Sequence, residues 1–133
     1  MPRLDDPWFG AEFYGQIEPG APDGSKGGSF TMQADRMEGA QGLALWCPCG
    51  FNDPRFRTPD GGRPHWLLVP FLNPRNAPPC PPDHGPHRTG DKNAPRPRWS
   101  VSGNYLHDLT ITPSIAVGSP ECWHGFITNG AII

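Results

Sequence analysis

Short apolar runs of strand length alternate with long polar segments along this chain. Residues 43–47 and 66–72 are two nearly continuous apolar runs, and each has the length of a single β-strand. Pro70 lies inside the second run, and because proline has no N–H to give to a ladder, it favours the edge of a sheet or a bulge. Two strands are therefore predicted in the middle of the chain, the second of them at an edge or bulged.

The last third of the chain alternates between apolar and polar positions. Residues 99–102 and 109–112 show this alternation, and Pro113 is expected to end the second strand. Residues 122–128 and 131–133 flank Asn-Gly, which favours a hairpin because both residues tolerate a positive φ. We expect antiparallel strands here, and we expect the side chains of Trp46, Trp99 and Phe126 to be buried.

Two segments lack strand patterns. Residues 1–42 predict an extended N-terminal arm, whose aromatic cluster of Trp8, Phe9, Phe13 and Tyr14 would dock on the body or on a partner. Residues 73–98 hold eight prolines and five basic residues, which is typical of a polyproline-like insertion. The remainder of residues 43–133 is predicted to form one β domain.

Composition makes a small core with long loops the expected architecture. The 133 residues include 19 Pro and 17 Gly, yet also 5 Trp, 7 Phe and 2 Tyr, which a disordered chain would lack. A core of this kind is marginal and benefits from a cross-link. The predicted fold class is mostly β, a small zinc-stapled antiparallel sheet or sandwich with long Pro/Gly-rich loops and the extended N-terminal arm.

The net charge and the hydrophobicity of the segments limit the classes of partner and the cellular location that we expect. A net charge of −2 argues against a general nucleic-acid binder, which normally carries a basic excess. The N-terminus has no apolar region typical of a signal peptide, and no apolar run has the length of a membrane span. We therefore expect a protein of the cytosol, where four cysteines indicate a metal before disulfides.

Two short motifs have the residue types of a zinc site. Cys47-Pro-Cys49-Gly follows a predicted strand, and Cys122-Trp-His124-Gly begins another. Zinc is held by four such ligands in a tetrahedron, and two distant pairs would close a long loop across the domain. Both spacings are tighter than those usual for zinc, so two pairs of buried thiols stay an alternative, whereas a Cys47–Cys49 disulfide would be strained.

For the other residues that could bind a metal or take part in catalysis, the surrounding sequence gives less support to a functional role. Cys80, His84 and His87 have metal-capable spacing but lie in the Pro-rich insertion, where solvated loop residues are the simpler interpretation. Lone histidines at 65 and 107 favour a surface role. A catalytic zinc would need a carboxylate base, and Glu121 or Asp108 are the candidates near the motifs. Ser114 has no nucleophile-elbow context.

Four motifs occur along this chain: Cys-Pro-Cys-Gly at 47–50, Trp-Ser-Val at 99–101, Leu-Thr-Ile-Thr-Pro-Ser at 109–114, and Cys-x-His-x-Phe-Ile at 122–127. Together they resemble a family of small uncharacterised domains from tailed phages and bacterial operons. The resemblance covers residues 43–51 and 99–132. It implies a zinc site at Cys47, Cys49, Cys122 and His124. Some members carry peptidase labels and others ammonia monooxygenase labels, and no residues of this chain support either activity.

These observations lead to a function hypothesis with two alternatives. The main hypothesis is a non-enzymatic, zinc-stabilised structural or interaction protein, phage-encoded and part of a virion as a cement, decoration or adaptor protein. Its partners would be capsid or tail proteins or further copies of itself, with no membrane, in the host cytoplasm. The alternatives are a small zinc-dependent, peptidase-like hydrolase, and an intracellular effector that binds a host protein through its basic Pro-rich loop.

Overall fold

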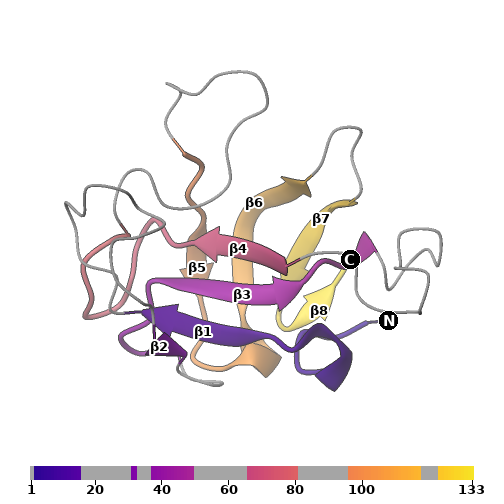
Figure 1. The fold of residues 1–133 in the computed structure, drawn as a ribbon, viewed down its shortest axis with the longest axis horizontal. Helices are drawn as coiled ribbons and strands as arrows, with labels where there is room; N and C mark the ends of the chain where they lie inside the picture. The colour runs from indigo at the N-terminus through magenta and orange to yellow at the C-terminus, as the bar shows by residue number, and fades with distance from the viewer. Residues whose placement is uncertain (1, 16–30, 33–36, 50–65, 81–95, 118–122) are drawn as a thin grey trace.

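A computed structural model gives the fold, and it describes residues 2–15, 31–32, 37–49, 66–80, 96–117 and 123–133. The described strands form two four-stranded antiparallel sheets that pack face to face (Figure 1). Phe13 and Leu43 of one sheet share a single hydrophobic core with Ile111 and Ile127 of the other. The predicted mostly-β class is confirmed.

The first sheet is covered on both faces. Its strands lie in the order β2 (Thr31–Met32), β1 (Glu12–Gly15), β3 (Gly42–Trp46) and β4 (Trp66–Pro70). Leu43 and Leu45 point into the main core, while Ala44 between them packs with Tyr14 and Cys80 in a smaller cluster on the opposite face. The continuous apolar run that predicted β3 reflects this double burial, and β4 is an edge strand as Pro70 predicted.

The described residues of the second sheet are buried on one face and exposed on the other. Its order is β5 (Ser100–Ser102), β6 (Thr110–Val117), β7 (Trp123–Thr128) and β8 (Ala131–Ile132). Burial alternates strictly along β7, where Trp123, Gly125 and Ile127 face the core. The alternation of the sequence therefore marks a sheet with a solvent face.

The Asn-Gly hairpin between β7 and β8 is confirmed. Asn129 and Gly130 have φ of 50° and 80°, the left-handed values that a type I′ turn requires. A Cβ on Gly130 would overlap the carbonyl oxygen of His107, so only glycine fits this close approach. The Gly130 N–H donates to the carbonyl of Leu109 at 2.9 Å, which holds the turn beside the 3-10 turn η3 (Leu106–Asp108).

Residues 2–15, within the predicted arm, are integrated into the body. The Leu4 N–H donates to Gly130 at 2.8 Å, which ties the start of the chain to the β7–β8 hairpin. The 3-10 turn η1 (Pro7–Phe9) follows, and β1 then lies between β2 and β3. Phe9 and Phe13 are fully buried, so this part of the aromatic cluster docks on the body itself. The division of the chain at residue 42 stays a prediction.

Two local expectations are wrong. Pro113 does not end a strand, because β6 continues to Val117. The pairing of β6 with β7 is irregular between Ile111 and Ile115, and Pro113, which follows a cis Thr112–Pro113 bond, lies in this stretch. Phe126 is 50% exposed because it lies on the solvent face of β7. Trp46 is half-buried, while Trp99 is buried as expected. No helix in the described ranges has the length and apolar character needed to cross a membrane.

Candidate active site

A serine and a histidine meet on the solvent face of the second sheet. The Ser114 Oγ lies 2.9 Å from His124 Nε2, within hydrogen-bond distance. Ser114 is half-buried on β6, and His124 is exposed on β7. This is the contact that a nucleophilic hydroxyl and its general base require, with the hydroxyl donating to an unprotonated Nε2.

Strand register explains why the two side chains meet. Ala116 lies directly opposite His124, and Ser114 is two residues before Ala116 on the same strand. Ser114 and His124 are therefore diagonal neighbours on one face, at a separation that a long or aromatic side chain spans. Because Trp123 and Gly125 face the core, His124 between them must face solvent.

An irregularity in β6 places Ser114 at a break in the ladder. Ile111 pairs with Ile127 and Ile115 pairs with Gly125, so three residues of β6 stand opposite Phe126 alone. Extra residues of this kind bend a strand and redirect its side chains, and they occur frequently beside active sites. Thr112 and Pro113 are both exposed, so the approach to Ser114 along β6 is open among the described residues.

A buried indole holds the backbone of Ser114. Trp99 is 5% exposed, and its Nε1–H donates to the carbonyl oxygen of Ser114 at 3.3 Å. The backbone of Trp99 is in turn bonded to the first sheet, through Pro70 and Leu72. The position of Ser114 is thus tied to the core and to both sheets.

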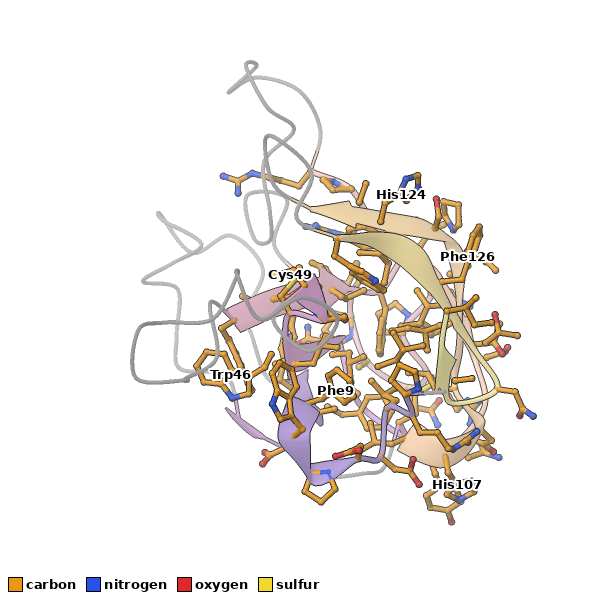
Figure 2. The ribbon with its side chains drawn as sticks, turned by 90° about the vertical axis from the view of Figure 1, so that its right-hand side faces the viewer. Phe9, Trp46, Cys49, His107, His124 and Phe126 are labelled. Atoms are coloured by element: carbon orange, nitrogen blue, oxygen red, sulfur yellow. The ribbon has the colours of Figure 1, made fainter. Side chains whose placement is uncertain are left out.

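Three of the four predicted zinc ligands lie in the described part of the chain. Cys47 and Cys49 are buried thiols at the end of β3 and belong to the core cluster between the sheets. His124 projects from the second sheet to solvent, whereas Cys49 lies at the end of the first sheet (Figure 2). Cys122 lies outside the described residues. Within the described ranges no three His, Cys, Asp or Glu side chains come together, and the four-ligand site stays a prediction.

The weaker sequence candidates have structural roles where they are described. Asp108 accepts from the backbone N–H groups of Tyr105 and Asn104, at 2.8 and 3.0 Å, and these donors lower the pKa of its carboxyl. It closes the η3 turn and takes no part in the Ser114–His124 pair. His107 is exposed and stacks on Tyr105. Residues 65, 84, 87 and 121 lie outside the described part of the chain.

Cys80 lies on the outer face of the first sheet. Its thiol donates to the carbonyl of Gln41 at 3.5 Å and is hydrogen-bonded to Tyr14. Burial raises the pKa of Cys80 to about 11 and the pKa of Tyr14 well above its ordinary value. Both groups are therefore neutral at physiological pH, which suits packing rather than nucleophilic chemistry.

Comparison with known families points to the same part of the chain. A model of the family described as "Bacterial ubiquitination-like system serine protease (BubE)" matches residues 77–133. The matched segment contains β5 to β8, and with them Trp99, Ser114 and His124. No curated protein and no solved structure matches the chain.

This similarity corrects the function hypothesis. A serine-protease family is enzymatic, so the interpretation as a non-enzymatic structural or interaction protein of a phage virion is wrong. The match supports the bacterial-operon side of the resemblance, and the peptidase-like alternative lies closer to it. The zinc in that alternative and the proposed partners remain predictions.

Sequence reasoning missed Ser114. The sequence alone disfavours Ser114 as a nucleophile because it lacks a strand–turn–helix nucleophile elbow, which is one of several settings that activate a serine. One signal was available: alternation along residues 123–128 points His124 to solvent, away from a core metal site. The pairing with Ser114 depends on the register across an irregular strand, which no local pattern gives.

Proposed function

We propose that this chain is a serine protease in which Ser114 is the nucleophile and His124 is the general base. The 2.9 Å contact between Ser114 Oγ and His124 Nε2 carries the proposal. The family match over residues 77–133 supports it, because that segment contains both residues. Exposure of His124 and partial exposure of Ser114 leave the pair accessible to a substrate.

The reaction follows from this pair by ordinary acyl-transfer chemistry. Ser114 Oγ attacks the carbonyl carbon of the scissile amide while its proton passes to His124 Nε2. The carbon–nitrogen bond breaks, and the same proton goes to the leaving amine. Water then loses a proton to His124 and attacks the acyl-serine, and the proton returns to Ser114 as the carboxylic acid leaves.

The rigid setting of the serine is the contribution of the fold. A nucleophile is effective only when it is held within a fraction of an ångström of the attacking position. Trp99 fixes the carbonyl of Ser114, and the neighbouring Ile115 is fully buried in the core. The serine is thus anchored on both sides of its Cα, while only its hydroxyl end reaches the histidine.

The substrate proposal comes from the name of the matched family. A protease of a ubiquitination-like system would cut an amide at the C-terminal carbonyl of a ubiquitin-like protein, freeing it from a target or from an extension. Ser114 and His124 lie on an exposed strand face, which suits a bond that is itself presented by a folded protein.

Cleavage assays with two substrates test the proposal. Fluorescein-labelled casein reports general proteolysis, and ubiquitin 7-amido-4-methylcoumarin reports cleavage after a ubiquitin-like C-terminus. Ser114→Ala is expected to reduce cleavage at least about a thousandfold, whereas Ser102→Ala, an exposed serine of β5, is the matched control and keeps wild-type rates. Cleavage by Ser114→Ala at the wild-type rate would refute the assignment.

A further inference from the structure

The edge of β6 beside Ser114 is not covered by β5. The ladder between the two strands runs from Ser102–Thr110 to Ser100–Thr112 and stops there. β6 itself continues to Val117, five residues further. In the described part of the chain, no strand pairs with β6 on this side beyond Thr112.

The reason is that the chain before Ser100 belongs to the other sheet. Trp99 N–H donates to Pro70 at 3.1 Å, and its carbonyl accepts from Leu72 at 2.7 Å. These bonds form a parallel bridge between Trp99 and Phe71. The backbone N–H and C=O of Trp99 are therefore already hydrogen-bonded to Pro70 and Leu72, so Trp99 cannot extend the β5–β6 ladder.

The direction of the backbone groups on this edge follows from the β7–β8 hairpin. Phe126 exchanges both of its backbone hydrogen bonds with Ile133, at 3.0 and 2.9 Å, so its N–H and C=O face β8. By alternation, the backbone groups of Gly125 point toward β6, where its partner is Ile115. Ala116, the next residue of β6, then directs its N–H and C=O away from β7, toward the uncovered edge.

We propose that the substrate binds as an added strand along the β6 edge at Ser114–Val117. In this arrangement the substrate backbone pairs with Ala116, and its scissile carbonyl reaches Ser114. Strand addition to an exposed edge is a common way of recognising an extended peptide, and the main-chain bonds supply its affinity. The inference rests on the proposed function, because the nucleophile and the edge are parts of one strand.

Three observations favour an extended peptide as the occupant. Ala116 is exposed and has a small side chain, which leaves the backbone beside it accessible. The Ser114 carbonyl on the same side is already bonded to Trp99, so the first available backbone pair is that of Ala116. Ala116 also lies directly opposite His124, so β6 alone separates the added strand from the strand that carries the general base.

Reactive probes separate this inference from the proposed function. A small alkyl fluorophosphonate reports the Ser114–His124 pair alone, while acetyl-tetra-alanyl diphenylphosphonate also offers a peptide backbone. We compare the labelling rate of this peptide with that of analogues carrying one N-methyl group at each amide in turn. Methylation of the amide that pairs with Ala116 is expected to slow labelling about three- to tenfold, the value of one hydrogen bond, while the other positions change little.

A substitution in the protein gives the complementary result. Ala116→Pro removes the edge N–H but no bond to β7, and the ratio of peptide to fluorophosphonate labelling is expected to fall about three- to tenfold. Ala116→Val is the matched control, since it keeps the N–H and the ratio. The methylated peptides test the wild type, so the inference stays testable even if the proline variant does not fold.

The remaining outcomes are distinct. Equal labelling by all methylated peptides, or fluorophosphonate labelling without any peptide labelling, would overturn strand addition and leave the Ser114–His124 assignment intact. Failure of the fluorophosphonate itself to label Ser114 would overturn the assignment, and the inference with it.

Discussion

The two sheets have the same number of described strands but differ in how their faces are buried. In the first sheet β3 is buried on both faces, with Leu43, Ala44 and Leu45 all at 0% exposure. In the second sheet β7 alternates between core and solvent, and its solvent face carries His124 and Phe126. The comparison separates the roles: the first sheet contributes stability, and the second exposes a face on which side chains can do chemistry without loss of packing.

The largest predicted effect falls on the solvent face of the second sheet. His124→Ala is expected to reduce the rate of cleavage by about a hundred- to ten-thousandfold, because it removes the general base. Stability is expected to stay near wild type, since His124 is exposed. Thr128→Ala, another exposed β7 position on the same face, is the control for kinetics and for urea unfolding.

A comparison of two phenylalanines tests the division of roles directly. Phe13→Ala in the first sheet removes a fully buried ring and is expected to cost about 3–5 kcal/mol of unfolding free energy. Phe126→Ala on the second sheet removes a ring that is 50% exposed, and we expect less than about 1 kcal/mol. Urea midpoints of both variants give the answer, and equal losses would contradict the one-sided burial of the second sheet.

Metal analysis distinguishes two uses of His124. The pairing with Ser114 predicts that His124→Ala retains the metal content of the wild type, whereas a site of Cys47, Cys49, Cys122 and His124 predicts its loss. Elemental analysis of purified protein measures this, with Cys47→Ser as the variant that a cysteine-based site must respond to. Loss of zinc in both variants would show that His124 is a metal ligand and would contradict its assignment as the general base.

The smallest predicted effect is a loss of folding stability at alkaline pH, caused by Cys80 on the first sheet. Because burial raises the pKa of Cys80 from 9.0 to about 11, the unfolded chain releases this proton first as pH rises. The contribution of Cys80 to stability is therefore complete below about pH 9 and is lost toward pH 11. Cys80→Ser does not titrate there, so its urea midpoint is expected to fall less than that of wild type over this range; parallel curves would exclude the linkage.

The sequence predicted those strands whose pattern depends only on local burial. The continuous run at residues 43–47 and the Asn129-Gly130 turn were sufficient for β3 and for the β7–β8 hairpin. The passage of β6 through Pro113 was not predictable in this way, because proline normally ends a strand. It is tolerated here by an irregularity that depends on the register of β7.

Of the two residues of the candidate site, the sequence indicates a functional role for His124 but not for Ser114. Cys122 lies two residues before His124 in the sequence, and this pairing indicates a metal ligand rather than a general base for a serine. Ser114 and His124 are ten residues apart on adjacent strands, and the three-to-one irregularity opposite Phe126 shifts Ser114 from a position directly opposite His124 to a diagonal one. A pairing of that kind is a property of the tertiary structure, and residue types and spacing alone do not specify it.

The most direct measurement is the site of covalent modification by an alkyl fluorophosphonate, located by peptide mass spectrometry. The account predicts a single adduct on Ser114, formed in wild type and Ser102→Ala, absent in Ser114→Ala, and strongly slowed in His124→Ala. An adduct on another residue, or unmodified Ser114 in folded wild-type protein after prolonged exposure, would contradict the assignment of Ser114 as the nucleophile.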